Sequence, residues 1–248
     1  MARILLLETS TATLSAALSV DGKVVQDRVC TEPRQQASLA APMVKEVLDA
    51  AGLRVADCDA VCVSKGPGSY TGLRVGVSTA KGLCFGAGIP LIAIGTLDIL
   101  VAGSLGAQRH RGSGGLAPQS VEDKFDHGND EPVFIVPMID ARRMEVYTAV
   151  FSPDGKQLTP VEARVIGPES FADELAEGPV LFVGDGALKC REVLSSPNAI
   201  FREAAPLARH MAPLAEAAFA QKKFEDVAYF EPFYLKDFVA TVSRKNLF

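Results

Sequence analysis

The sequence predicts an α/β protein in which mixed sheets are flanked by helices and divided between two lobes. Short apolar strands alternate with segments of helical periodicity, which is the pattern of a layered α/β fold. Asp21-Gly22 is a two-residue hairpin signal, so part of the first sheet is antiparallel. A polar stretch without apolar periodicity, from Gly103 to Glu131, separates the two halves of the chain.

The N-terminus is expected to form a three-stranded antiparallel meander. Arg3–Glu8 and Thr13–Val20 have strand patterns, and the Asp21-Gly22 turn leads into a third strand over Lys23–Val29. All three strands therefore precede the first predicted helix along the chain.

Two helices and two further strands follow in the first half. A helix is predicted over 36–51, with Pro42 inside it and Gly52 where a C-terminal cap belongs. Its apolar positions at helical spacing are Leu39, Met43, Val44, Val47, Leu48 and Ala51. A strand over Ala60–Val63, a Gly-rich turn, a helix over 70–85, a strand over Leu91–Ile94 and a helix capped by Thr96 complete this half.

The predicted domains are a first lobe over 1–103, a linker or loop over 104–131 and a smaller second lobe over 132–248. Strands are expected over Val133–Ile139, Glu145–Phe151, Val161–Ile166 and Pro179–Val183, with a short helix from about Glu169. A helix near 207–222 is expected to pack back on the first lobe, and the tail 231–235 is expected to be extended.

Composition limits the classes of function. The charge of −5 opposes general attraction to a nucleic acid backbone, so another chain should hold most of any RNA substrate. The five cysteines are scattered without a C-x-x-C pair, which favours reduced thiols over disulfides or zinc. No apolar run is long enough for a membrane span and no signal peptide is recognisable, so we expect a cytoplasmic protein without membrane contact.

Polar residues gather where predicted strands end. Glu8-Thr9-Ser10-Thr11 follows the first strand, and Gly66-Pro67-Gly68-Ser69 precedes a helix whose free N–H groups could attract an anion. In an open sheet such strand ends face the ligand crevice, although each turn could equally be an ordinary hydrogen-bonded one. The candidate anion or nucleotide crevice consists of Glu8, Thr9, Ser10, Gly68, Ser69, Asp140, Arg142, Gly184, Asp185 and Gly186.

Small residues recur every four positions in the helix predicted over 70–85. Gly72, Gly76 and Ala80 form this row, with Gly82 and Gly86 as a second pair, although an interior glycine costs about 1 kcal/mol relative to alanine. A row of this kind admits a second backbone, which belongs either to the same monomer or to a partner. The sequence contains no H-E-x-x-H, G-x-S-x-G or Walker-type motif, so metal-assisted and triad chemistry lack their parts.

Four segments together resemble the TsaB family, also called YeaZ. They are residues 4–10, the Gly66–Arg74 segment, Ile139-Asp140-Ala141-Arg142 and the tail Glu231–Leu235. The resemblance implies an actin/hexokinase/Hsp70-like fold of two ribonuclease-H-like lobes. It also implies a non-catalytic role in making threonylcarbamoyladenosine beside the tRNA anticodon, where the paralogue TsaD transfers the threonylcarbamoyl group and the ATPase TsaE binds the pair.

Family members are expected to pair with the paralogue through their first two helices, or with themselves when it is absent, and tRNA is expected to be contacted mainly through the partner. The partner interface implied for this chain consists of Leu39, Met43, Val47, Gly72, Val75, Gly76, Thr79, Ala80 and Leu83.

This sequence departs from the related patterns in ways that bear on cofactors. Where the catalytic paralogue carries a metal-binding histidine pair, this chain has Gln35, Gln36, Leu39 and Ala40, so no cofactor is expected here and ATP and metal are assigned to partner subunits. The first strand ends in Glu8 rather than Asp, and no glycine follows it. An independent small-molecule kinase or ATPase remains the alternative, motivated by Glu8, Ser10 and Gly184-Asp185-Gly186. A peptidase lacks a nameable nucleophile and base.

Overall fold

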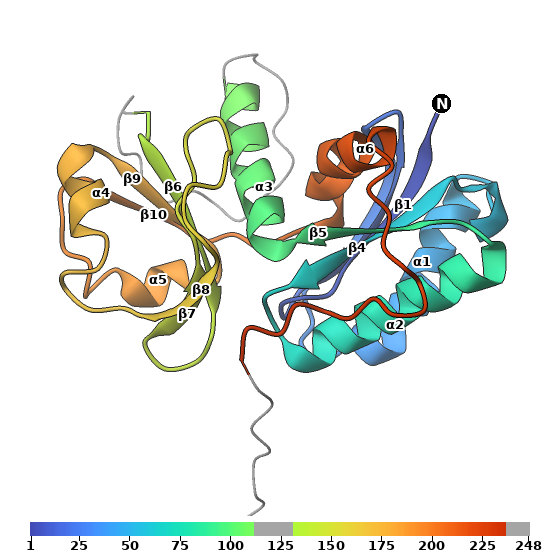
Figure 1. Ribbon diagram of the computed structural model, residues 1–248, viewed down its shortest axis with the longest axis horizontal. Helices are drawn as coiled ribbons and strands as arrows, with labels where there is room; N and C mark the ends of the chain where they lie inside the picture. The colour runs from blue at the N-terminus through green and yellow to red at the C-terminus, as the bar shows by residue number, and fades with distance from the viewer. Residues whose placement is uncertain (112–130, 237–248) are drawn as a thin grey trace, which may run out of the picture.

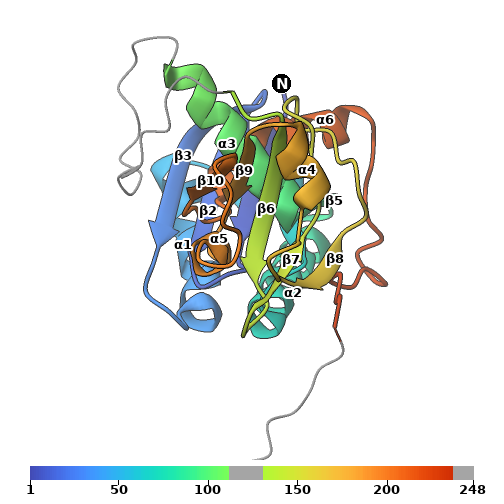
Figure 2. The same ribbon diagram turned by 90° about the vertical axis from the view of Figure 1, so that its left-hand side faces the viewer.

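The structure, a computed structural model, describes the backbone of residues 1–111 and 131–236. It contains two five-stranded sheets, one in each lobe, with helices packed on their faces (Figure 1). Figure 2 shows the same molecule from the side of the second lobe, with the second sheet in front of the first. None of the helices in these two ranges is long and apolar enough to cross a membrane.

The first sheet has the strand order β3-β2-β1-β4-β5. The strands β1 (Arg3–Glu8), β2 (Leu14–Val20) and β3 (Lys23–Cys30) are antiparallel, whereas β4 (Ala60–Gly66) and β5 (Leu91–Gly95) run parallel to β1. The predicted meander is thereby confirmed. Both faces of β1 are buried, which explains its unbroken apolar run from residue 4 to residue 7.

Helices cover both faces of the first sheet. On one face lie α1 (Gln36–Ala50) and α2 (Tyr70–Ala87), which pack on the odd-numbered leucines of β1. On the other face lie a short 3₁₀ segment, η2 (Ala208–Met211), and α6 (Ala212–Ala220), which pack on Ile4 and Leu6. A second 3₁₀ segment, η1 (Val55–Asp57), joins α1 to β4.

The second sheet repeats the topology of the first. It consists of β6 (Phe134–Asp140), β7 (Glu145–Thr148), β8 (Glu162–Val165), β9 (Val180–Val183) and β10 (Ala199–Arg202), in the order β10-β9-β6-β7-β8. Its central strand β6 has an antiparallel pair on one side and a parallel pair on the other, as β1 has in the first sheet. The ends of β1 and β6 are therefore equivalent positions in the two lobes.

Three more helices complete the fold. The second lobe carries α4 (Ala172–Glu177) and α5 (Ala187–Cys190), while α3 (Thr96–Arg111) lies between the lobes. Leu97, Leu100 and Val101 of α3 share a hydrophobic cluster with β6 and β9 of the second lobe.

The extent of α3 corrects the expectation that a linker begins at residue 104. The helix runs to Arg111. Within it Leu105 packs against the same cluster, and Ser104 Oγ donates a hydrogen bond to the Leu100 carbonyl oxygen at 3.0 Å. The remainder of the predicted linker, residues 112–130, lies outside the described residues.

Candidate functional site

Glu8, at the end of β1, is fully buried and is held by its own turn. Its Oε1 atom accepts hydrogen bonds from the Ser10 backbone N–H at 2.8 Å and from the Ser10 hydroxyl. The other carboxyl oxygen, Oε2, is buried without a hydrogen-bond partner among the described residues. Burial raises the pKa of Glu8 to about 7, and the charge of Asp185 in the second lobe adds to this rise, whereas interactions with Ser10 and with the Ser64 hydroxyl oppose it.

The Gly-rich segment before α2 packs against the Glu8 turn. Ser69 caps α2, as predicted, by accepting a hydrogen bond from the Gly72 N–H at 3.3 Å. The Ser69 N–H donates to the Ser10 carbonyl oxygen at 2.6 Å. A Cβ atom on Gly68 would collide with that same carbonyl. The loop therefore uses part of its predicted anion-binding geometry to hold the neighbouring turn.

The row of small residues on α2 is covered by the protein itself, which corrects part of the predicted partner interface. Gly72, Gly76 and Ala80 are buried, and a Cβ atom on either glycine would collide with Thr9. The Thr9 hydroxyl donates to the Gly72 carbonyl oxygen at 2.8 Å. Close approach of the β1–β2 turn therefore explains these glycines, and a foreign helix has no access to them.

Met43 and Val47 of α1 are also unsuited to a partner interface. Their exposed fractions are 7% and 0%, because both side chains pack in the core between α1, α2 and the first sheet. Their helical spacing marks the apolar face of α1, and the sheet of the same lobe covers this face.

The other predicted interface residues lie along the seam between α1 and α2. Leu39, Val75, Thr79 and Leu83 are half-buried there. On the solvent side of α2, Gly82 and Gly86 are exposed, and a Cβ atom on either would meet no other atom within 4 Å. Phe85, which the sequence analysis did not single out, is 86% exposed. Its position outside the buried stripe of α2 was the signal that could have identified it.

In the second lobe, the end of β6 contacts the loop after β9. In the same way, the end of β1 contacts the loop after β4 in the first lobe. The Asp140 backbone N–H donates to Asp185 Oδ1 at 2.9 Å, and Lys189 forms an ion pair with Asp140. Burial and the charge of Asp140 raise the pKa of Asp185, while the Asp140 N–H and Lys189 oppose the rise. A Cβ atom on Gly184 would collide with the Met138 carbonyl oxygen, and the Gly186 N–H donates to that oxygen at 3.0 Å.

Arg142 belongs to the same turn through its backbone. Its N–H donates to Asp140 Oδ1 at 2.8 Å, and its φ of 72° lies in the left-handed region. The side chain of Arg142 is exposed. The arginine thus shapes the turn and directs its guanidinium to solvent.

The sequence analysis named Thr96, at the end of β5, only as a helix cap and did not single out Asp98. The predicted cap is wrong, because the Thr96 hydroxyl donates to or accepts from no group among the described residues. Thr96 is fully buried, and burial raises the pKa of Asp98 while the charge of Lys65 opposes this. Both residues follow a strand parallel to β1, and that position was the signal available in the sequence.

Taken together, the candidate crevice residues form two turns, one in each lobe, that are held largely by their own hydrogen bonds, although Glu8 Oε2 lacks a partner among the described residues. The charge of Asp185 nevertheless acts on Glu8 across the lobes. A carboxyl group that is fully buried and already bonded to Ser10 is poorly suited to bind a hydrated cation.

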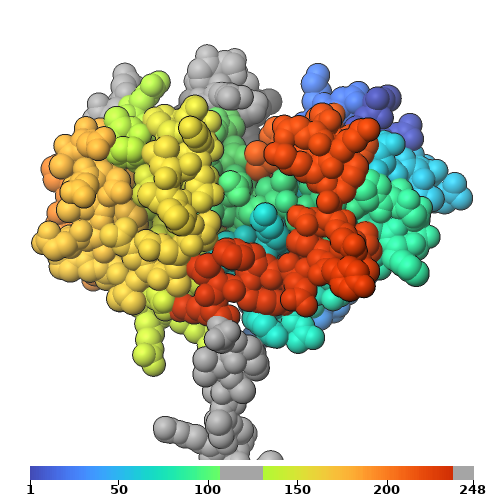
Figure 3. Space-filling view, viewed as in Figure 1, coloured from blue at the N-terminus to red at the C-terminus, as the bar shows by residue number. Residues whose placement is uncertain are grey.

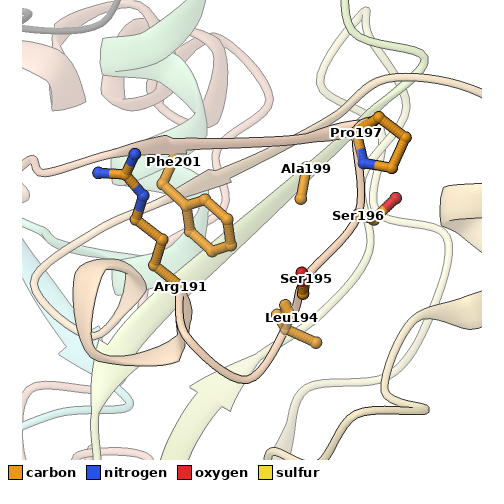
Figure 4. A pocket seen from close by; sticks show the side chains of 7 residues that line it. All are labelled: Arg191, Leu194, Ser195, Ser196, Pro197, Ala199 and Phe201. Atoms are coloured by element: carbon orange, nitrogen blue, oxygen red, sulfur yellow. The ribbon is translucent and has the colours of Figure 1, made fainter.

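A separate pocket lies between α5 and β10 on the second lobe (Figure 4). Its volume is about 400 Å³, and none of the candidate crevice residues lines it. The lining residues are Arg191, Leu194, Ser195, Ser196, Pro197, Ala199 and Phe201. Arg191 and Phe201 both line it, and the other labelled residues come from the loop between α5 and β10 and from the start of that strand.

Two sheets of identical topology, one in each of two lobes, define a protein of the actin/hexokinase/Hsp70-like class. The family model "tRNA N6-adenosine threonylcarbamoyltransferase" (TsaD) matches residues 32–112, which include α1 and α2. The chain is 30% identical to "tRNA threonylcarbamoyladenosine biosynthesis protein TsaB" of Escherichia coli, covering 96% of both chains, and 28% identical to its Bacillus subtilis counterpart, covering 94% of this chain and 93% of that one.

A solved structure has the same architecture. "YeaZ from Pseudomonas aeruginosa" superposes with a TM-score of 0.74 at 27% identity, over 95% of this chain and all of that one. The chain belongs to the TsaB family, and the resemblance seen in the sequence is confirmed.

Proposed function

We propose that this chain is a non-catalytic subunit that binds and supports a TsaD-type transferase in threonylcarbamoylation of the tRNA adenosine next to the anticodon. The name of the family supports a role in the biosynthesis of this nucleoside. The observation that carries the subunit role is the seam between α1 and α2, where half-buried apolar residues lie beside glycines that are open to solvent, within the segment that matches the TsaD model.

The N-terminus of α1 supports a structural rather than a metal-binding role for this region. The Gln36 side-chain amide donates to the carbonyl oxygens of Thr11 at 2.8 Å and Ala12 at 3.1 Å. This amide therefore ties α1 to the β1–β2 turn. The Gln36 side chain therefore has a structural role at the start of α1, in the region where the catalytic paralogue is expected to carry its histidine pair.

The proposal includes the remaining partners and the cofactors. A TsaE-type ATPase binds the pair, the isolated chain forms a homodimer, and tRNA is contacted mainly through the transferase, in agreement with a net charge of −5. The chain itself holds no nucleotide, because the Glu8 carboxyl group is buried and occupied by Ser10. Isothermal titration with Mg-ATP should therefore give no heat, whereas binding with turnover would favour the small-molecule kinase or ATPase instead.

Co-expression with a TsaD-type paralogue, followed by size-exclusion chromatography, tests the interface. Gly82→Leu and Gly86→Leu add bulk on the solvent side of α2, where the folded monomer has room, so each should abolish a stoichiometric complex while the circular dichroism spectrum of the chain stays unchanged. Gly106→Leu in α3 is the matched control, since a Cβ atom there also meets nothing within 4 Å. A complex that survives both α2 changes would refute this interface.

A further inference from the structure

Beyond α6 the chain returns across the first lobe as a segment without helix or strand, residues 225–236, which we call the strap (Figure 1). It contains one turn, at residues 227–229. It begins at the free edge of the first sheet, where the Glu225 N–H donates to the Leu91 carbonyl oxygen at 2.9 Å and forms an isolated antiparallel bridge to β5. The strap is thereby anchored to the sheet at its start.

The middle of the strap is fixed to α2. Lys81 Nζ donates to the carbonyl oxygens of Ala228 at 3.1 Å and Phe230 at 3.0 Å. The side chains of Val227 and Phe230 pack against the core between α2 and the sheet. Buried apolar side chains and a charged donor therefore hold this part in one place.

Further along, the strap is tied to the loop before α2. The Phe233 N–H donates to the Lys65 carbonyl oxygen at 2.7 Å. Gly66 has a φ of +105°, and a Cβ atom there would lie 2.7 Å from the Phe233 carbonyl oxygen, so only glycine fits under the strap. The Tyr234 and Tyr70 rings pack with their centroids 4.9 Å apart. This loop is the one that packs against the Glu8 turn.

The end of the strap reaches the second lobe. Lys236 forms an ion pair with Glu145 of β7, and its ammonium group lies 5.7 Å from the centre of the Tyr147 ring. Both charged side chains are partly buried, at 36% and 24% exposure, so their attraction is screened less than that of an exposed pair. Figure 3 shows the strap in contact with both lobes, below a hollow in the surface between them.

We propose that the strap is a clasp that limits the relative motion of the two lobes, closed by the ion pair between Lys236 and Glu145. The hydrophobic packing of α3 joins the lobes at one place, and the strap crosses at another, below α3 in Figure 1. The backbone between β10 and η2, residues 203–207, also passes from the second lobe to the first. Domains with a small interface usually pivot about such connections, and the strap adds a further one that restrains the pivot. The strap thus controls how closely the Glu8 turn and the Asp185 loop approach.

Charge reversal in the full chain tests the clasp. Spin labels at Glu46→Cys in α1 and Glu177→Cys in α4, both exposed positions, report the distance between the lobes by pulsed electron resonance in a Cys30→Ser background. Lys236→Glu and Glu145→Lys should each shift part of the distance distribution to longer values, and the double reversal should restore the wild-type distribution. Arg54→Glu, which breaks an ion pair within the first lobe, is the control and should change nothing.

Identical distributions in the wild type and in both single reversals would overturn the proposal. If a single reversal lowers the melting temperature below the measuring range, Lys236→Gln removes the ion pair without introducing repulsion, and the same comparison decides. The proposal would also be contradicted if the distance distribution changed in the single variants and stayed changed in the double variant. The change would then not depend on the ion pair between Lys236 and Glu145.

Discussion

The side chain of Thr9 occupies the space that Gly76 leaves open on α2. A Cβ atom at residue 76 would collide with the Thr9 hydroxyl oxygen, and that hydroxyl donates to the Gly72 carbonyl oxygen one turn earlier at 2.8 Å. The turn after β1 and the first half of α2 are therefore fitted to each other, and the glycines are required by the monomer.

We predict that Gly76→Ala destabilises the protein even though alanine is the better helix former. Overpacking against Thr9 should cost about 1–3 kcal/mol, which exceeds the gain of about 1 kcal/mol in helix propensity. Urea unfolding should show a net loss of stability. Thr9→Ala makes room for the new methyl group, so the double variant should recover part of the loss beyond additivity.

Gly82→Ala is the matched control in the same helix. Since a Cβ atom there meets nothing within 4 Å, this change should stabilise the protein by about 1 kcal/mol. If Gly76→Ala stabilised the protein to the same extent, the close contact with Thr9 would not exist in solution.

This contrast shows what the sequence could and could not predict. Local signals were sufficient for the hairpin at Asp21-Gly22, where both residues have positive φ, and for the Ser69 cap of α2. The spacing of Gly72 and Gly76 identified a face of the helix that something approaches closely. It could not identify what approaches, because the contact with Thr9 spans 63 residues of sequence and depends on the tertiary fold.

The parts of the fold that were not predicted from the sequence are short elements and a helix of partly polar composition. The four-residue elements α5 and β10 were not predicted, since so few residues carry little periodicity. The second half of α3 was assigned to a linker because its composition is polar. Its packing by Leu105 against the second lobe depends on a contact that the sequence does not display.

Glu8 should make stability fall as pH rises. Its pKa is raised from 4.5 to about 7 in the folded protein, so its contribution is fully favourable below pH 4.5 and is lost as pH rises through 7. Glu8→Gln keeps an acceptor for Ser10 but cannot ionise. The variant should exceed the wild type in stability by about 3 kcal/mol at pH 8.5, and this difference should shrink towards pH 5.

Urea unfolding at the two pH values measures this difference, with the exposed Glu46→Gln in α1 as the control that should show none. A Glu8→Gln variant that is less stable than the wild type at pH 8.5 would show that the carboxylate, and not the carboxylic acid, is the form the fold favours.

Asp185→Asn should lower the pKa of Glu8. The Asp185 carboxylate contributes to the raised pKa across the two lobes, while an asparagine Oδ1 can still accept the hydrogen bond from the Asp140 N–H. A carbon-13 NMR titration of the Glu8 carboxyl group in the wild type and the variant measures the change. An unchanged titration midpoint would mean that the two side chains are further apart in solution than in this structure.

His210 should make stability fall as pH decreases, which is opposite to the effect of Glu8. Its ring packs on Gly103 of α3, its Nδ1 atom is buried without a partner among the described residues, and burial lowers its pKa from 6.5 to about 4. The neutral ring is therefore the folded form. Its contribution is fully present above pH 6.5 and is lost as pH falls towards 4, by about 2 kcal/mol between pH 7 and pH 5.

As pH falls from 7 to 5, Glu8 should add to the free energy of unfolding roughly what His210 removes from it. The stability of the wild type should therefore change little over this interval, which would hide the contributions of both groups. Comparing variants at each pH separates them. His210→Phe keeps a ring against Gly103 but cannot be protonated, so in a Glu8→Gln background it should remove the loss of stability between pH 7 and pH 5. If that loss persisted in the double variant, another group would have to be responsible for it, and the buried imidazole would be protonated at no cost to the fold.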